Sequence, residues 1–595
     1  MSLKSTVLWF IFSTIFLFFT SCSTNKNIDS EKEIVLRLEP SNGNPRNSEG
    51  DFIQLKNGRI LFVYTHFTEG SGDNAGAYLA GRYSADDGIT WSAEDVTILG
   101  NEGGMNIMSV SLFRLSDERI ALFYLRKNSE SDCIPFMRTS DNEAESWSEP
   151  TRCIPDSGYF VVNNDRVVRL KSGRIIFPVS RHKTPTTETT NIGKIWCYYS
   201  DDEGQTWTKG NEALNPDQAT TQEPGVIELK DGKLLLFCRT ESGTQYYSHS
   251  SDQGVNWSVL KPSNIKSPLS PAAIERIPKT GDLILVWNNN YKPIHDGGNR
   301  TPYNLAISKD EGKTWEKIKP IASDPNGWYC YTAIEFVGDH VLLGHCAGDR
   351  SKNVGLATTN ITRLNLDWIY SDATLTPTIK TDSSGIVEID CADKDAKIYY
   401  SLERKMPEKL YKSPISVTRT TPLWVYAKSK GKSDSELITT YVGTNILQSS
   451  LTEPISKGDG IIYNYYEGSA TRIKNIEKLN LKSKGVLDKF SINDRMVDTS
   501  FAFIFNGFIE IPKDGKYTFY LASNDGSVLF LDDHELINHD GPHGMVEESA
   551  TVSLRKGKHK IVVKYFQMLG GKGLMLSWKG PGFDKEEIPE SVLSH

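Results

Sequence analysis

The chain has few cysteines, no excess of positive charge and almost no long apolar run, and each shortage excludes a class of protein. Only 8 of its 595 residues are cysteine, and no C-x-x-C or His/Cys ligand spacing argues for a structural metal. The formal net charge of −8 and the pI near 5.9 give no overall attraction for nucleic acid or for an anionic membrane surface. An anionic ligand would therefore need local arginines that oppose the overall field.

The one long apolar run covers residues 7–19 and is short for a membrane-spanning helix. It leads into F-T-S-C, which ends at Cys22 and resembles a bacterial lipobox. The resemblance implies a signal peptide over residues 1–21, lipidation of the Cys22 thiol, and a lipoprotein of the outer membrane or cell surface. An ordinary secretory signal or an uncleaved anchor is the alternative. Residues 22–34 are polar and predict a flexible tether.

Without Cys22, seven cysteines remain, and an odd number cannot all pair. Cys197 and Cys238 lie inside apolar strand patterns, where a free thiol behaves as a small hydrophobic side chain. Cys133 with Cys153 is the one pair for which a disulfide is worth testing.

What the sequence does have is a repeat. The octet S-K-D-E-G-K-T-W at residues 308–315 has four upstream relatives at intervals of 50 to 60 residues, which begin at Ser84, Ser140, Ser200 and Ser250. Each copy predicts a tight turn, in which Asp and Gly supply local hydrogen bonds and a positive-φ position. Paired apolar strands lie between the copies. About four strands in each repeat is the pattern of a propeller blade, and about six such units fit residues 35–370.

The repeated octet resembles the Asp-box (BNR repeat) of six-bladed sialidase-type propellers, over a little more than half of the chain. The resemblance implies an all-β fold in which a six-bladed β-propeller is followed by two β-sandwich domains. In that family the box is a structural turn away from the active face, and it also occurs in propellers that are not enzymes. The box therefore indicates the fold and does not decide the function.

Two shorter units follow. Residues 371–445 resemble the small β-sandwich at the C-terminus of chitobiases and β-hexosaminidases, which usually acts as a spacer. Residues 455–595 alternate with period two, as antiparallel sandwiches do, and resemble the protective-antigen type of carbohydrate-binding domain. In sugar-binding members of that type an adjacent Asp pair holds Ca²⁺, and Asp532 and Asp533 take the matching place. The alternative is that the two residues only make a β-turn.

The sialidase resemblance also assigns site residues. A sugar carboxylate beside a crowded anomeric carbon calls for arginines that bind it bidentately, and for a neutral tyrosine nucleophile that the carboxylate does not repel. In this resemblance Glu223, in a Q-E-P-G segment, activates the tyrosine, while Arg239 and Arg300 are the second and third arginines. Tyr331 has the better register for the nucleophile, and Tyr329 is the fallback.

Further upstream, Arg46 matches the first arginine, and Asp73, in a glycine-rich loop, matches the acid. Sialidases usually follow the first arginine with Ile-Pro, whereas this chain has N-S-E, which leaves room for another ulosonic or uronic acid. His66, Arg166 and His182 are further candidates for the pocket, and their alternative roles are surface hydrogen bonds or strand-edge ion pairs.

The sequence thus predicts a surface lipoprotein glycoside hydrolase that resembles exo-α-sialidases and needs no cofactor for catalysis. Its substrates would be terminal sialic acids or related acidic sugars on glycans. Two alternatives stay open: a non-catalytic glycan-binding lipoprotein, and a propeller hydrolase or lyase for another acidic polysaccharide. In the last case His66 and His182 would matter more than Tyr331.

Overall fold

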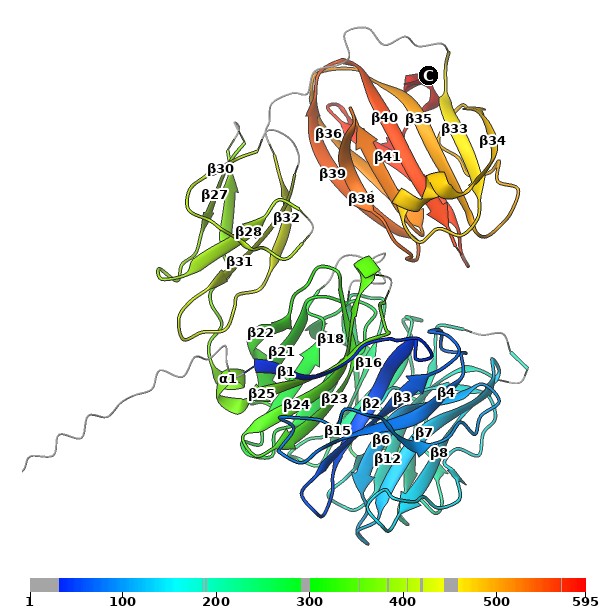
Figure 1. The fold of residues 1–595 in the computed structure, drawn as a ribbon, viewed down its shortest axis with the longest axis vertical. Helices are drawn as coiled ribbons and strands as arrows, with labels where there is room; N and C mark the ends of the chain where they lie inside the picture. Colours follow the sequence, from blue (N-terminus) through cyan, green and yellow to red (C-terminus); the bar gives the residue numbers. More distant parts are fainter. Residues whose placement is uncertain are drawn as a thin grey trace, which may run out of the picture.

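The computed structural model describes residues 32–184, 186–187, 190–290, 300–352, 354–382, 385–403, 405–417, 421–443, 458–568 and 570–595. Almost all of this is strand and turn, and the described part holds one α-helix, α1 (Leu366–Tyr370), at the end of the first domain. Figure 1 shows a propeller, a small sandwich beside it and a larger sandwich at the C-terminus. The predicted fold class is confirmed. Cys22 lies outside the described residues.

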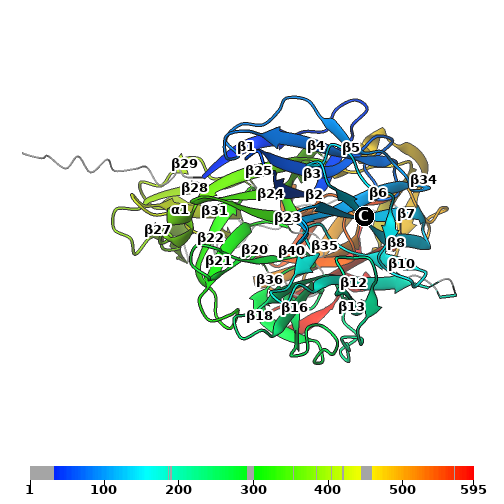
Figure 2. The same ribbon diagram turned by 90° about the horizontal axis from the view of Figure 1, so that it is seen from below.

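Six blades surround a common axis, and Figure 2 shows them as a ring. Blade 1 contains β2 (Arg46–Gln54), β3 (Ile60–Phe67), β4 (Ala77–Ser84) and β5 (Val96–Leu99). Blade 2 contains β6 (Asn106–Arg114), β7 (Ile120–Ser129), β8 (Asp132–Ser140) and β9 (Thr151–Arg152). Blade 3 contains β10 (Tyr159–Val161), β11 (Val168–Arg169), β12 (Ile175–Lys183), β13 (Lys194–Ser200) and β14 (Thr208–Lys209). Blade 4 contains β15 (Gln222–Glu228), β16 (Leu234–Arg239), β17 (Thr244–Ser250) and β18 (Lys261–Lys266). Blade 5 contains β19 (Ala273–Arg276), β20 (Leu283–Trp287), β21 (Tyr303–Ser308) and β22 (Glu316–Ala322). Blade 6 contains β23 (Gly327–Val337), β24 (His340–Asp349), β25 (Thr359–Asn365) and β1 (Lys32–Leu38).

The ring is closed by the N-terminal strand. β1 pairs antiparallel with β25, so the first strand of the domain completes its last blade. β1 begins at Lys32, three residues before the boundary expected for the propeller. The N-terminal and C-terminal strands of the propeller thus lie in one sheet, and the ring cannot open between blades 6 and 1 without breaking the hydrogen bonds between β1 and β25.

The repeated octets form closely similar turns at one end of the propeller, and we call them the box turns. In the last copy Ser308 Oγ accepts from Gly312 N (2.8 Å), while Asp310 accepts from Thr314 N (2.8 Å) and Thr314 Oγ1 (2.7 Å). The copy that begins at Ser84 has the same bonds. These bonds span only eight residues, which explains why the motif can be recognised in the sequence.

The box turns also join neighbouring blades. The glutamate at the fourth position of two boxes reaches the hairpin turn of the preceding blade: Glu143 Oε2 accepts from Lys56 N (2.7 Å), and Glu311 Oε2 accepts from Lys230 N (2.7 Å). Glu203 makes the same kind of contact with the Ser116 hydroxyl (2.6 Å). The repeat therefore stabilises the ring as well as each blade.

The seven cysteines of the described part are all free and buried, including Cys133 and Cys153, so the disulfide considered for that pair is not formed. Burial raises the pKa of the Cys133 thiol to about 12, which keeps it protonated and unreactive. Cys197 and Cys238 act as small core side chains, as their apolar surroundings in the sequence indicate.

The small sandwich packs a three-stranded sheet on a four-stranded one around Val387, Leu423 and Val425. The first sheet has β26 (Thr378–Thr381), β27 (Ile386–Asp390) and β30 (Ile415–Ser416); the second has β29 (Lys409–Leu410), β28 (Lys397–Ser401), β31 (Thr421–Lys428) and β32 (Ile438–Val442). Its resemblance to the chitobiase module stays a prediction.

The C-terminal sandwich has its own aromatic core, which includes Phe503, Phe505 and Phe519. Its larger sheet contains β33 (Ile461–Glu467), β34 (Asn480–Leu487), β35 (Phe501–Ile511), β37 (Ser527–Leu531), β38 (His534–His539), β40 (Gly557–Gln567) and β43 (Leu593–Ser594). Its smaller sheet contains β36 (Gly515–Asn524), β39 (Val546–Leu554), β41 (Gly573–Gly580) and β42 (Phe583–Glu587), and the connections include the 3₁₀ turns η3 (Ile473–Lys478) and η4 (Glu590–Val592).

Asp532 and Asp533 form the turn between β37 and β38, with φ values of 49° and 63°. Asp532 accepts from His559 Nδ1 (2.6 Å) and Lys560 N (2.9 Å), and Asp533 pairs with Lys560 Nζ (2.6 Å). The β-turn alternative therefore describes their backbone. In the part of the chain that is described, no group of three or more His, Cys, Asp or Glu residues has metal-binding geometry, and the calcium site stays a prediction.

No helix among the described residues is long and apolar enough to cross a membrane.

Candidate active site

The end of the propeller opposite the box turns is built from bulges. In five blades a residue other than glycine has a positive φ near the start of the inner strand: Glu49 (55°), Ser109 (61°), Asp165 (52°), Glu223 (50°) and Tyr331 (56°). In β2, β6, β15 and β23 the pairing register shifts at that residue, as it does at a β-bulge. A bulge re-aims a side chain that regular alternation would point elsewhere, and strained residues of this kind collect at functional sites.

The bulges leave backbone groups without ladder partners, and side chains of neighbouring blades satisfy them. Asn164 Nδ2 donates to Gly50 O (2.7 Å) and to Tyr331 O (3.2 Å), and so holds two bulges from a third blade. Asp165 Oδ2 accepts from Ile334 N (3.0 Å). The bulged conformation is therefore fixed by contacts between blades, because each bulge alone is strained.

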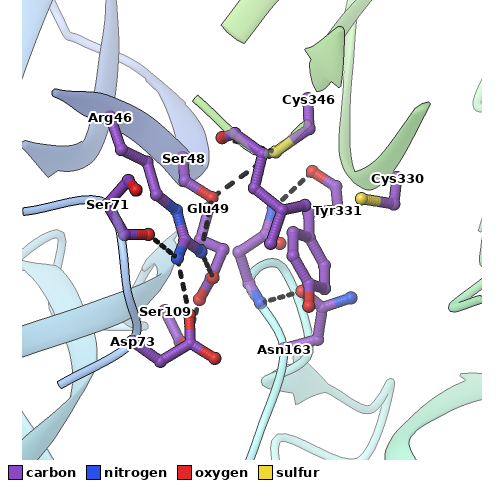
Figure 3. A network of polar contacts seen from close by, with 12 residues as sticks. Arg46, Ser48, Glu49, Ser71, Asp73, Ser109, Asn163, Cys330, Tyr331 and Cys346 are labelled. Carbon is purple, nitrogen blue, oxygen red and sulfur yellow. Dashed lines mark hydrogen bonds and ion pairs between the residues drawn. The ribbon is translucent and has the colours of Figure 1, made fainter. Parts of the chain in front are cut away.

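Arg46 is the most deeply buried arginine of the site, at 1% exposure. Its guanidinium pairs with Asp73 Oδ1 (2.5 Å) and Glu49 Oε1 (2.8 Å), as Figure 3 shows. It also lies 4.5 Å from the centre of the Phe67 ring. It also donates to the carbonyl of Ser71, which fixes the acid loop to β2. Two carboxylates thus share one guanidinium.

Glu49 is the pocket residue that sequence reasoning missed. Burial raises its pKa to about 7, although Arg46 favours the charged form, and the Ser109 hydroxyl donates to its second oxygen. One signal was available: Glu49 and Glu223 both stand nine residues before the glycine of their hairpin turns, Gly58 and Gly232. The two glutamates are equivalent positions of blades 1 and 4.

Asp73 lies in the loop between β3 and β4, and its side chain is 60% exposed. Desolvation raises its pKa, but the Arg46 guanidinium outweighs this effect and holds the pKa below its ordinary value. Lys127 Nζ donates to the Asp73 carbonyl (2.8 Å) and positions the loop. Asp73 is therefore ionised while it is paired with Arg46.

Glu223 and Arg239 come from the neighbouring strands β15 and β16, as the sequence predicted. Glu223 Oε2 and Arg239 Nη1 are 3.3 Å apart, and the two side chains are 8% and 11% exposed. Arg239 Nε donates to Gln222 Oε1 (2.9 Å), which orients the guanidinium.

Tyr331 lies near the start of β23 in blade 6, and Arg300 lies just before β21 in blade 5. The guanidinium of Arg300 is 5.3 Å from the centre of the Tyr331 ring. Burial and then the Glu223 carboxylate raise the pKa of Tyr331, while Arg300 and Arg239 lower it, and the net pKa is well above its ordinary value. Tyr329 instead stacks on Tyr303 (5.6 Å) in the core between blades 5 and 6. The geometry thus brings Tyr331, and not Tyr329, to the arginines.

Two cysteines in the wall of the pocket were also not foreseen. Cys330 and Cys346 face each other in the ladder of β23 and β24. Cys330 Sγ accepts from Arg300 Nη1 (2.8 Å), and Cys346 Sγ is 3.4 Å from Ser48 Oγ. Figure 3 shows both thiols beside Tyr331.

The three additional candidates fall in different places. His182 is buried beside the Glu223 and Arg239 pair, which influences its pKa, and it is held by Thr190 O (2.6 Å). Arg166 lies buried against Phe237 and donates to Ala272 O (2.6 Å). His66 pairs with Asp95 (2.9 Å) and stacks on Tyr78 in blade 1, so its placement in the pocket is corrected.

Several buried polar atoms of the site have no hydrogen-bond partner in the described part of the chain. They are Arg46 Nε, Asn163 Nδ2 and Arg300 Nε; Glu223 Oε2 and Arg239 Nη1 also make no hydrogen bond, but they form an ion pair with each other. Buried polar atoms normally have partners, and a cluster of unmatched ones marks a place for a polar ligand.

Comparisons with known proteins find similarity in two parts of the chain. Residues 90–342 match a BNR repeat-like domain, and residues 480–591 match a PA14 domain. The chain is 26% identical over 246 residues to a sialidase of Clostridium perfringens, which covers 36% of this chain and 61% of that protein. It is 30% identical over 158 residues to an anhydrosialidase of Macrobdella decora, which covers 24% of this chain and 19% of that protein.

Among solved structures, an intramolecular trans-sialidase of Ruminococcus gnavus has a TM-score of 0.45 at 15% identity, covering 56% of this chain and 97% of that one. The match spans less than two thirds of the length of the two sequence relatives. The chain is thus similar to sialidases in its BNR-repeat region and to PA14 domains in its C-terminal sandwich.

Proposed function

We propose that the protein is an exo-acting glycosidase of sialidase type, which removes a terminal α-linked sialic acid or a related acidic sugar from glycans. One observation carries the proposal. Arg239 and Arg300 lie beside Glu223 and Tyr331, and Arg46 lies beside Glu49 and Asp73. Each of the three guanidiniums has a buried nitrogen without a hydrogen-bond partner among the described residues. Such a site suits an anion with a planar carboxylate.

The arginines would hold the substrate by its carboxylate. Arg239 and Arg300 keep their guanidiniums close to Tyr331, where both influence its pKa, so the carboxylate would be bound beside the attacking oxygen. Their burial makes these contacts strong, because water does not screen them.

Tyr331 would attack the anomeric carbon as the nucleophile. Its raised pKa means that the phenol is neutral at ordinary pH, so it needs a base that accepts its proton during attack. Glu223 is the carboxylate that acts most strongly on its pKa, and it would take that proton. The neighbouring guanidiniums would then stabilise the phenolate that develops.

Asp73 would protonate the leaving oxygen, and this requires a change in its pairing. While Arg46 holds its pKa low, Asp73 is a poor acid. A substrate carboxylate that binds Arg46 would displace Asp73, remove the charge that lowers its pKa, and so favour the protonated form. Binding would thereby prepare the acid for its step.

The decisive experiment is incubation with 3′-sialyllactose, followed by mass analysis of the released sugar. Hydrolysis gives free sialic acid, whereas an intramolecular transfer gives an anhydro sugar lighter by one water. A Tyr331→Phe variant should release neither. If the wild type binds the glycan without releasing sugar, the protein is a glycan-binding protein and the enzymatic proposal fails.

We also propose that the protein is a lipoprotein of the bacterial surface, on the motif that ends at Cys22. Wild type should partition into the detergent phase of a two-phase separation, and Cys22→Ala should stay in the aqueous phase. Equal partitioning of the two would contradict lipidation.

A further inference from the structure

A second cavity lies where the three domains meet. It has a volume of about 470 Å³, within the range of small-molecule sites. The propeller contributes Asn289 and Asn326, the small sandwich Trp424 and Glu436, and the C-terminal sandwich Asp540. In Figure 1 the C-terminal sandwich lies above the propeller, and in Figure 2 it lies behind the ring along its axis.

Hydrogen bonds between the domains fix the walls of this three-domain cleft. Arg472, just before η3, donates to Asp540 O (3.0 Å) in its own sandwich. It also donates to the carbonyl of Arg350 in the propeller, the first residue of the 3₁₀ turn η2 (Arg350–Lys352). Asn289 Nδ2 donates to Glu436 Oε1 (2.8 Å) between propeller and small sandwich. The cleft is therefore built by specific contacts and not by loose apposition of domains.

The cleft lies close to the candidate active site, which we call the arginine pocket after Arg46, Arg239 and Arg300. The guanidinium of Arg300, in the pocket, lies 5.1 Å from the centre of the Trp328 ring, and that of Arg350, in the cleft, lies 5.5 Å from the same centre. Thr301, the residue after Arg300, also lines the cleft. Trp328 and Thr301 therefore bring the arginine pocket and the cleft next to each other.

The side chains of the cleft suit a sugar. Amides, carboxylates and guanidiniums can bind the paired hydroxyls of a pyranose ring, because they offer two donors or acceptors at fixed spacing. An aromatic ring such as that of Trp424, which is partly exposed, offers an apolar face for the C–H side of the same ring. Both kinds of surface line this cleft.

We propose that the three-domain cleft is a carbohydrate-binding site for the neutral sugars that follow the terminal acidic residue of a glycan. The proposal rests on the proposed function, because the terminal residue would occupy the arginine pocket. It gives the two sandwiches a part in substrate choice, since the cleft needs residues from all three domains.

The test compares two substrates with the same acidic sugar: a fluorogenic aryl glycoside, which has no further sugars, and 3′-sialyl-N-acetyllactosamine. Trp424→Ala should raise KM for the oligosaccharide about tenfold and leave KM for the aryl glycoside unchanged. The matched control is Tyr399→Ala, an aromatic residue on the neighbouring strand β28 that does not line the cleft. It should change neither value, and thermal unfolding would check that both variants fold.

Equal changes for both substrates, or no change for either, would overturn the proposal. A defect seen with a sialylated glycoprotein but not with the free oligosaccharide would also overturn it, because the cleft would then recognise protein. Binding of N-acetyllactosamine to the full-length protein, measured by saturation-transfer NMR, tests the cleft separately from the proposed glycosidase function. If the wild type cleaves neither substrate, the proposed function fails, and binding that Trp424→Ala abolishes would still support the cleft.

Discussion

At one end of the propeller, five copies of an octapeptide repeat the same turn with nearly the same hydrogen bonds. At the other end, five blades repeat a positive-φ position, and the side chain at that position differs among most of them. Ser308 and Asp310 bond only within their own box. Glu49 and Tyr331, in contrast, depend on partners from other blades. The box end repeats its residues, and the pocket end repeats only its backbone.

The comparison teaches how a symmetric ring obtains an asymmetric site. Blades 1 and 4 both place a glutamate on their bulge, but Glu49 lies between Arg46 and Ser109, whereas Glu223 lies beside Arg239. The same positive-φ backbone position directs one side chain of each of these blades toward the propeller axis. The residues around that side chain then determine its role. We therefore expect changes at the pocket end to affect function, and changes at the box end to affect stability.

The largest effect is expected for Tyr331→Phe. The change removes the attacking oxygen and keeps the ring, so kcat should fall by about a thousandfold or more while the affinity for a substrate analogue and the midpoint of thermal unfolding stay the same. Steady-state kinetics and calorimetry would measure both. If Tyr329→Phe lost activity and Tyr331→Phe kept it, the assignment from the bulge would be wrong.

Arg239→Ala should weaken binding of the substrate, because it leaves Glu223 buried without its ion-pair partner and removes a ligand of the carboxylate. Loss of one partner from a desolvated charge pair predicts an affinity lower by roughly 30-fold to several thousandfold. Isothermal titration with a sialic acid analogue would measure it. Arg174→Ala, which breaks an ion pair with Asp201, should leave the affinity unchanged. Similar losses in both variants would contradict a specific role for Arg239.

At the box end, Ser308→Ala should destabilise the fold and leave kcat and KM unchanged. It removes the acceptor of the buried Gly312 N and a donor to Asp310, at a cost of about 1 to 3 kcal/mol in the free energy of unfolding. Urea unfolding would measure the loss. The control Lys313→Ala, in the same box, should be nearly neutral. A kinetic defect in Ser308→Ala would break the division between the two ends.

The smallest effect concerns pH. Because the pKa of Glu49 is raised to about 7, the folded protein binds the proton of this carboxyl more tightly than the unfolded chain does. The protonated carboxyl therefore contributes its full stability below the ordinary pKa of 4.5. This contribution is lost as the pH rises through about 7. Above that pH, ionised Glu49 also competes with the substrate for Arg46. KM should therefore rise by about fivefold, the low end of typical coupling between two linked binding events.

Glu49→Gln should flatten this pH profile, because its side chain cannot ionise. The measurement is KM between pH 5 and pH 9 for both proteins, on the aryl glycoside. An unchanged profile in the variant would assign the titration to another group.

The sequence by itself determined the blades, their hairpins, both sandwiches and the neighbouring strands that carry Glu223 and Arg239. It succeeded because these features depend on contacts within one turn or one pair of neighbouring strands: the box bonds span eight residues, and Gln222 and Arg239 face each other across a single hairpin. Short-range contacts leave a pattern in the sequence that can be read directly.

Only the tertiary structure decided between Tyr329 and Tyr331, because residues two apart share a face in a regular strand and the bulge at Tyr331 breaks that rule. It also placed Glu49 in the pocket, removed His66 from it, and formed the three-domain cleft. Each of these depends on contacts between segments far apart in the chain, and such contacts are fixed by the packing of blades and domains rather than by any local run of residues.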